Sequence, residues 1–299
     1  MSVTLGHNQY GKAETRVVRI YRDTDPHEIV DYNVSVALSG DFTDIHLTGD
    51  NAKCLTTDAT KNTVNAFAKE HGEAARQPES FGIALAKHFV DDVEPVGRAR
   101  IKIEAYPWNR LSHNGSPHPH AFARDGGYVR TVTVTYDGTS LWVVSGVRDF
   151  VVLKTTDSEF FGYLEEKYTT LQPTHDRVMA TAVTSQWWHT RTEDVDWGKS
   201  YDSALLTMSD VFAGHHSLAL QQTMYAMGEA MITEQPEIGE VRFSLPNKHH
   251  FVIDLSPFGL DNPNEVFYAA DRAYGFIEGT VHNDDAPAPG LAFDPGQGW

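Results

Sequence analysis

The sequence predicts an α+β protein built from two copies of one module, and three observations lead to this prediction. Two segments with the alternation of β-strands are followed by two with apolar residues at helical spacing and by two further strand-like segments. This β-β-α-α-β-β order occurs a second time, without residue-by-residue identity between the halves. The length of 299 residues also exceeds that of one typical domain. We expect modules at residues 1–137 and 138–283 and a tail at 284–299.

The first module is predicted to contain, in order, strands at 16–22 and 28–42, helices at 57–72 and 79–92, and strands at 98–108 and 127–136. Turn residues from Asp23 to Pro26 separate the first two strands. In the first helix Val64 and Phe67 lie at helical spacing, and Thr56 offers a side chain that can cap the N-terminus. A long loop is expected at 109–126.

The second module is predicted to contain strands at 141–153 and 176–188, helices at 201–216 and 217–234, and strands at 241–253 and 265–278. Each module would form a four-stranded antiparallel sheet with both helices on one face. Such a sheet leaves open edges and an uncovered face, and joining copies edge to edge into a barrel removes both. We therefore expect a closed oligomer. The Pro- and Gly-rich tail is expected to be loosely ordered.

Composition and charge limit the function classes. Apolar residues make up 40% and charged residues 22% of the chain, as in an ordinary globular protein. The net charge of −17 argues against nucleic acid or an anionic membrane as partner, since both need a basic surface. An anionic small substrate remains possible, because a local Arg or Lys dominates within the screening length of about 8 Å.

The sequence also predicts a cytoplasmic location. Cys54 is the single cysteine, which rules out an intrachain disulfide and fits a reducing compartment. The first residues lack the apolar core of a signal peptide, and no apolar run approaches the roughly 18 residues of a membrane span. GxGxxG, Walker, GxSxG and HExxH motifs are absent, so nicotinamide, flavin and ATP chemistry have no sequence support.

Residues 153–189 contain the first candidate binding residues. An aromatic patch of Phe160, Phe161 and Tyr163 is followed by Arg177, which lies 17 residues after Phe160 and within the strand predicted at 176–188. An aromatic face beside a fixed cation suits a planar, electron-rich, anionic heterocycle. On this stretch alone, the alternative is that the phenylalanines belong to the core and that Arg177 makes a structural salt bridge.

A polar run from Pro246 to His250 interrupts an otherwise strand-like segment. Unpartnered polar residues within a strand cost free energy, so the run is interpreted as a bulge directed at a site. Side chains alternate along a strand, which places Asn247 and His249 on one face and Lys248 and His250 on the other. His249 can transfer a proton near neutral pH. An exposed hairpin tip is the alternative.

Three further features carry weaker signals. Gln221, on the Met-rich helix, has one acceptor and two donors that suit an amide-bearing ring, although most helical glutamines are exposed. Lys12 precedes the first strand, and a catalytic lysine there would need burial to lower its pKa. Histidines cluster in the loop from His113 to His120, but its prolines force an extended backbone and no Cys or carboxylate lies at ligand spacing. We assign no metal site to this loop.

Six motifs together resemble the urate oxidase (uricase) family over nearly the whole chain. They are YGK at 10–12, TTDATKNT at 56–63, LKTTDSEFFGYLEEKYTTL at 153–171, DR at 176–177, QQTMY at 221–225 and LPNKHHFVIDL at 245–255. The resemblance implies two tandem tunnelling-fold (T-fold) modules and a homotetramer of stacked barrels that enclose a tunnel, with sites at subunit interfaces. It implies oxidation of urate by O2 to 5-hydroxyisourate and hydrogen peroxide, without metal or organic cofactor.

The resemblance also assigns roles to residues of this chain. Phe160 would be the stacking face and Arg177 a bidentate clamp, with Gln221 and the backbone around Leu220 on the opposite part of the ring. Asn247 and Thr57 would bind O2 or water over the ring, and Thr57 and Asp58 would come from a neighbouring subunit. The proton relay consists of Lys12, Thr57 and His249. Two points depart from the family pattern: Ala219 stands where some relatives have Ser, and the histidine loop has no assigned role.

Two alternatives remain open. The chain can be another enzyme of the same fold that acts on a pterin or purine, although such enzymes usually use a Glu anchor and several use His-bound zinc. It can also be a non-catalytic purine-binding protein that keeps Phe160, Arg177 and Gln221. Retention of Lys12, Thr57 and His249 argues against the second alternative, because binding alone needs no relay.

Overall fold

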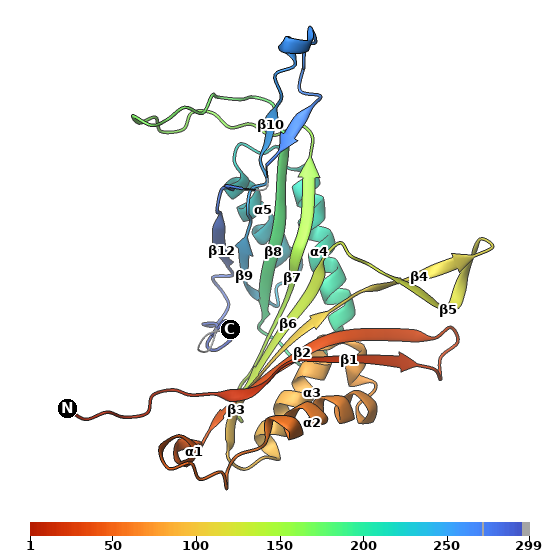
Figure 1. Cartoon of the computed structure of the whole chain (residues 1–299), viewed down its shortest axis with the longest axis vertical. Coiled ribbons are helices and arrows are strands. Elements are labelled where there is room, and N and C mark those ends of the chain that lie inside the picture. Colours follow the sequence, from red (N-terminus) through yellow and green to blue (C-terminus); the bar gives the residue numbers. More distant parts are fainter. Residues whose placement is uncertain (271, 295–299) are drawn as a thin grey trace. The chain divides into compact units, whose positions relative to one another are not determined.

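The computed structural model describes residues 1–270 and 272–294, and its helices and antiparallel strands confirm the predicted α+β fold (Figure 1). The chain divides into two compact units. One contains residues 1–146 and 188–200 and the tail from residue 287, and the other contains residues 147–187 and 201–286. No helix in the described part of the chain is long and apolar enough to cross a membrane.

The elements up to residue 136 are β1 (Tyr10–Tyr21), β2 (Glu28–Gly40), α1 (Thr43–Leu47), α2 (Thr57–Glu70), η1 (Ala74–Arg76), α3 (Pro78–Asp91), β3 (Val96–Ala105), β4 (Trp108–His113), β5 (Ser116–Arg124) and β6 (Val129–Tyr136). Strands β1, β2, β3 and β6 pair in that order, and each pair is antiparallel. Helix α2 packs on β1, and α3 packs on β3 and β6. The predicted strand-strand-helix-helix-strand-strand order is confirmed here, with β4 and β5 as an insertion.

Alternation along the strands explains how this first sheet buries one face. In β2 the buried residues Val34, Val36 and Leu38 alternate with less buried polar or small residues. They pack in one cluster with residues of α2 and α3 such as Val64 and Leu85. The same alternation in β3 sends Ile101 and Ile103 into that core. Burial of these apolar faces holds the helices against the sheet.

The elements from residue 141 onward are β7 (Leu141–Lys154), β8 (Met179–His189), α4 (Trp197–Gly214), α5 (Leu220–Glu234), β9 (Ile238–Ser244), β10 (His250–Val252), η2 (Ser256–Phe258), β11 (Phe267–Ala269) and β12 (Glu278–His282). The strand order is β7-β8-β9-β12, and β9 pairs with β12 in antiparallel register. Helix α5 packs on β9 and β12, where Met227 and Met231 are buried. Two strands, two helices and two strands of the sheet thus follow one another again, although β12 overlaps the strand predicted at 265–278 only at Glu278.

The loop expected at 109–126 is wrong, because β4 and β5 form an antiparallel hairpin there (Figure 1). Asn114 and Gly115 at its tip have φ angles of 50° and 79°. Two residues with positive φ are what a tight hairpin turn requires, and Asn-Gly is its strongest sequence signal. Pro117 and Pro119 are accommodated because β5 belongs to a two-stranded sheet with β4, in which both strands are edge strands.

Three strand boundaries in the second half also differ from the expectation. Strand β8 begins at Met179, so Arg177 lies in the segment before the strand and not within it. The strand expected at 241–253 is two strands, since β9 ends at Ser244 and β10 begins at His250. The strand expected at 265–278 is β11, a connection and the start of β12. Between β9 and β10, Asn247 makes isolated bridges to Thr181 and Gly275, which removes this segment from a continuous ladder.

The expectation of a loosely ordered tail is wrong for the part that the structure describes. Ala292 is buried, and the carboxylate of Asp294 lies 3.2 Å from Nη1 of Arg98. Nη1 of Arg100 donates to the backbone carbonyl of Asp294 at 2.8 Å. The tail is therefore packed on the unit that carries β3, while residues 295–299 lie outside the described residues.

Candidate active site

The segment between β7 and β8 brings Phe160 and Arg177 together. Phe160 and Thr174 exchange two backbone hydrogen bonds of 2.8 and 3.0 Å, which fold the segment back on itself. The guanidinium carbon of Arg177 lies 5.2 Å from the centroid of the Phe160 ring. A cation and an aromatic face are thus neighbours although 17 residues separate them in the sequence.

Ser158 holds the guanidinium of Arg177 in place. The backbone N–H of Arg177 donates to the carbonyl of Ser158 at 3.0 Å, and Nε donates to the Ser158 hydroxyl at 3.1 Å. Among the residues that the structure describes, Nη1 and Nη2 of Arg177 have no hydrogen-bond partner. Burial lowers the pKa of Arg177, yet a guanidinium stays charged at any physiological pH. The two terminal nitrogens are therefore available to a planar ligand with paired acceptors.

The start of α5 lies beside the same segment. Backbone N–H of Glu159 donates to the carbonyl of Ser217 at 2.7 Å, and N–H of Ser217 donates to the carbonyl of Asp157 at 3.2 Å. Leu220, the first residue of α5, is buried, whereas Gln221 is exposed. The first amides of a helix have no acceptor within the helix, so this end offers donors to a polar or anionic ligand.

Asn247 and His249 enter this unit through the connection between β9 and β10. The backbone N–H of Asn247 donates to the carbonyl of Gly275 at 2.9 Å. A methyl group placed on Gly275 would lie 3.5 Å from Cβ of Asn247 and 3.8 Å from Nε2 of His249. Both residues therefore border the same glycine, in keeping with the expectation that they share a side. Burial, then the charges of Arg177 and His250, lower the pKa of His249, which leaves a neutral proton acceptor at pH 7.

Lys12 lies within β1 at a β-bulge, so the expectation that it precedes the first strand is wrong. The register between β1 and β2 shifts between Lys12 and Thr15, and Glu14 has a φ of 56°. Before the bulge, a side chain on Gly11 would lie 1.9 Å from the carbonyl oxygen of Val36, so only glycine permits this approach of the two strands. Bulges commonly redirect neighbouring side chains, and Lys12 is the last paired residue before this one.

Thr57 and Asp58 are the first two residues of α2, as the cap chemistry predicts. The Thr56 side chain accepts a hydrogen bond from the backbone N–H of Ala59 at 3.1 Å. Asp58 accepts from Lys61 at 2.6 Å and from Asn62 at 2.9 Å. These contacts lower the pKa of Asp58, and the charge of Lys12 adds the weakest contribution. Lys12 therefore lies within electrostatic range of this helix end.

The expected site residues fall into two groups. Phe160, Arg177, Leu220, Gln221, Asn247 and His249 belong to the unit of residues 147–187 and 201–286, and Lys12, Thr57 and Asp58 belong to the unit that begins the chain. Within the first group Phe160 lies beside Arg177, and Asn247 and His249 border the same glycine. Within the second group Lys12 lies within electrostatic range of Asp58.

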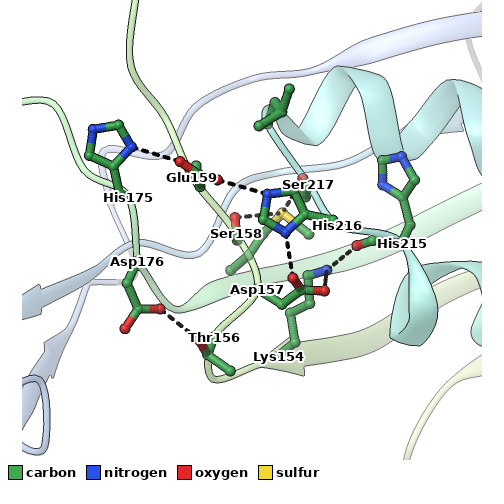
Figure 2. A network of polar contacts seen from close by, with 12 residues as sticks. Lys154, Thr156, Asp157, Ser158, Glu159, His175, Asp176, His215, His216 and Ser217 are labelled. Atoms are coloured by element: carbon green, nitrogen blue, oxygen red, sulfur yellow. Dashed lines mark hydrogen bonds and ion pairs between the residues drawn. The ribbon is translucent and has the colours of Figure 1, made fainter.

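Figure 2 shows a set of polar contacts around Asp157 and Glu159 that the sequence did not predict. The ring of His216 lies between the carboxylates of Asp157 and Glu159, and Glu159 also contacts Nδ1 of His175 at 2.7 Å. The sequence features that could have indicated these contacts are two acidic residues, Asp157 and Glu159, and the histidine pair His215-His216. Nothing local indicated that these two segments would meet.

The histidine cluster expected at 113–120 lies on the β4–β5 hairpin. His118 and His120 have ring centroids 4.5 Å apart, and those of His27 and His120 are 6.1 Å apart. Over residues 1–270 and 272–294, no three His, Cys, Asp or Glu side chains are arranged to hold a metal ion.

Comparison with known proteins supports one family. The family model described as Uricase matches residues 8–135 and 143–278. The chain is 48% identical over 286 residues to the uricase of Arthrobacter globiformis, with 96% of this chain and 92% of that protein covered. It is 38% identical to the uricase of Dictyostelium discoideum, with 93% and 97% covered. The crystal structure of the Arthrobacter globiformis uricase superposes with a TM-score of 0.91 and covers 96% of this chain and 98% of that one. The chain belongs to the uricase family.

Proposed function

We propose that this chain is a urate oxidase, which converts urate, O2 and water to 5-hydroxyisourate and hydrogen peroxide. The observation that carries the proposal is the guanidinium of Arg177, held by Ser158 at 5.2 Å from the Phe160 ring with both terminal nitrogens available. Membership of the uricase family supports the same reaction.

In this proposal urate binds as a flat monoanion. It stacks on the Phe160 ring, and stacking of a base on an aromatic side chain contributes roughly 1–3 kcal/mol. Arg177 donates two parallel hydrogen bonds to one edge of the purine, because its planar fork matches paired acceptors. The side chain of Gln221 and the backbone at Leu220 bind the opposite edge, and Asn247 holds O2 or water above the ring.

Lys12, Thr57 and His249 form the proposed proton relay. Removal of a further proton makes urate more electron-rich and easier to oxidise by O2 without metal or organic cofactor. The two electrons and two protons that leave urate reduce O2 to hydrogen peroxide, and water supplies the new hydroxyl group. A lysine at a bulge, a threonine at a helix N-terminus and a neutral histidine are groups that can pass these protons.

We further propose that the chain is two tandem T-fold modules, at 1–137 and 138–283, in a homotetramer whose barrels enclose a tunnel. The two separate matches of the family model, at 8–135 and 143–278, support the duplication. In this arrangement the Lys12, Thr57 and Asp58 group reaches the Arg177 group of a neighbouring subunit. We propose a cytoplasmic location on the basis of the single cysteine.

The test is a combined optical and oxygen-electrode assay with urate. We expect loss of the urate absorbance with equimolar O2 uptake and peroxide release, unchanged by chelators. Binding of urate without turnover would favour a purine-binding protein. Sensitivity to chelators would favour a metal-dependent enzyme of the same fold.

A further inference from the structure

The ring of His216 is held by two carboxylates of the segment that leads to Phe160 (Figure 2). Nδ1 contacts the carboxylate of Asp157, and Nε2 lies 2.8 Å from Oε1 of Glu159. His216 itself belongs to the turn between α4 and α5, one residue before Ser217. The side chain therefore joins the turn before Leu220 and Gln221 to the segment before Phe160.

Both ring nitrogens of His216 face acceptors, so both must donate and the ring is an imidazolium. The hydrogen bonds to Asp157 and then to Glu159 raise the pKa of His216. In return, His216 is the first cause that lowers the pKa of Asp157, and His175 followed by His216 lowers that of Glu159. One cation is thus shared by two anions on one short segment.

The side-chain contacts of His216 reinforce a backbone connection. The two hydrogen bonds between residues 157–159 and Ser217 form an isolated parallel bridge centred on Ser158 and Ser217, both of which are buried. An isolated bridge has no neighbouring ladder to support it, so its geometry depends on nearby side chains. Ser158 in turn carries the two hydrogen bonds that hold Arg177.

We propose that His216 is a positioning residue of the urate site: its imidazolium fastens the Asp157–Glu159 segment to the start of α5 and keeps Phe160 and Arg177 in register with Leu220 and Gln221. The inference rests on the proposed function of that site. His216 touches none of the groups assigned to urate, so it acts on binding through the geometry of the residues that do. Its removal raises KM and leaves the chemical step largely intact.

Other charged groups surround His216 and limit the effect of its loss. Lys154, at the end of β7, has Nζ 3.9 Å from Oδ2 of Asp157 and donates to the carbonyl of His215. His175 contacts the far oxygen of Glu159. His215, which directly follows α4, has its pKa lowered first by burial and then by Lys154 and His216. When His216 becomes neutral, Asp157 keeps Lys154 and Glu159 keeps His175 as a partner. The segment that contains the two carboxylates is therefore held less firmly but stays in place.

The direction of the pH effect follows from the raised pKa of His216. The clamp is complete below that pKa and is lost as pH rises through it, because a neutral imidazole donates from only one nitrogen. We therefore expect KM of the wild type to rise at alkaline pH toward that of a variant without the imidazolium, and the variant to lack this rise.

The experiment compares His216→Gln with the matched control His175→Gln in the full-length protein. Among the described residues His175 contacts the carboxylate of Glu159 and the ring of Phe161, whereas His216 contacts both Glu159 and Asp157. We measure KM and kcat for urate from pH 6 to 10 and the Kd of urate without O2, where binding occurs and turnover cannot. For His216→Gln we expect KM and the anaerobic Kd to rise about fivefold to twentyfold with kcat within about twofold, and for His175→Gln no change beyond about twofold.

Each outcome decides the proposal. An unchanged KM in His216→Gln, an equal rise in His175→Gln, or a change in Tm alone would mean that His216 is an ordinary surface ion pair, which typically contributes little. A parallel fall in kcat would make it part of the chemical step and overturn a positioning role. A wild type that neither binds nor oxidises urate would overturn the proposed function and this inference together, whereas an active wild type with an unaffected variant overturns this inference alone.

Discussion

At the scale of single residues, Arg177 has two distinct tasks. Its backbone N–H and Nε hold Ser158, while Nη1 and Nη2 have no hydrogen-bond partner among the described residues and bind urate in the proposed function. Lysine would keep the charge but could neither hold Ser158 through a second nitrogen nor donate two parallel bonds, so the exchange is not conservative here.

We expect Arg177→Ala to weaken urate binding by about 2–5 kcal/mol, because a buried anionic partner would be left unpaired. Arg177→Lys should recover only a small part of that loss. Anaerobic titration with urate measures both values. A loss below about 0.5 kcal/mol for the alanine variant would show that Arg177 is not the clamp.

The proposed relay role of Lys12 predicts the opposite pattern of kinetic changes, because a relay residue acts on the chemical step. We expect Lys12→Met to lower kcat by about 10²-fold or more, the range of general acid–base contributions, with little change in the anaerobic Kd of urate. Steady-state kinetics and the same titration separate the two quantities. A change in KM alone would contradict the relay.

At the scale of elements, the approach of β1 to β2 places Lys12. Gly11 is the point of contact, since a Cβ there would lie 1.9 Å from the backbone oxygen of Val36. Backbone atoms of a paired strand cannot move aside in the way that a flexible side chain can.

Gly11→Ala should therefore displace the start of β1 and cost about 1–3 kcal/mol, as overpacking typically does. Because Lys12 is the next residue, kcat should fall with stability. Gly6→Ala is the matched control, since nothing lies within 4 Å of a Cβ at Gly6. Equal denaturant midpoints and equal kcat for the two variants would show that the approach of β1 to β2 does not require glycine at position 11.

A buried polar network joins α3, β6, β7 and β8. The carboxylate of Glu79 accepts from Nη2 of Arg130 at 2.6 Å and from the Ser145 hydroxyl at 2.7 Å, and Nε2 of His189 lies 3.0 Å from the same hydroxyl. Burial, followed by the charge of Arg130, lowers the pKa of His189 to about 3. His189 is therefore neutral in the folded protein under all physiological conditions.

This network predicts a pH dependence of stability. Below the ordinary His pKa of about 6.5 the unfolded chain binds a proton that folded His189 does not, so stability falls as pH drops. Below that pKa, His189 lowers the free energy of unfolding by about 1.4 kcal/mol for each unit that the pH drops. Urea unfolding measures the free energy of unfolding at pH 7 and at pH 5. The difference between these two free energies should be smaller for His189→Gln than for the wild type. Equal differences in the two proteins would contradict a neutral buried His189.

At the scale of the whole molecule, the expected site residues are divided between two compact units of one chain. The resemblance to the uricase family implies that the two groups meet across a subunit interface. In that proposal each active site needs residues from two subunits. Mixing subunits of two inactive variants tests it.

We expect co-assembly of Lys12→Met and Arg177→Ala subunits to restore activity. A mixed interface can bring an intact Lys12 group to an intact Arg177 group, whereas neither variant has a complete site alone. Subunits are mixed by co-expression, purified through two different tags and assayed with urate, with each variant alone as control. Activity no greater than the sum of the controls would place the whole site within one chain.

Local patterns in the sequence determined the order of the elements. Alternation in β2 and helical spacing in α2 and α3 are set by neighbours along the chain, so they were predictable. The β4–β5 hairpin was also encoded locally, by Asn114-Gly115, but the surrounding Pro and His residues concealed the signal. Residue types and positions indicated Phe160, Arg177, Asn247 and His249 as candidates, whereas the roles of the candidate site residues rest on the resemblance, since such roles have no local periodicity.

Only the tertiary structure decided how distant segments meet. Phe160 lies beside Arg177 because Phe160 pairs with Thr174, and His216 lies between Asp157 and Glu159 because the turn before α5 bridges to Ser158. Such contacts join residues up to 59 positions apart, and the sequence carries no periodic trace of them. Periodicity reports which face of an element is buried, whereas the partner on that face is selected by the packing of the whole unit.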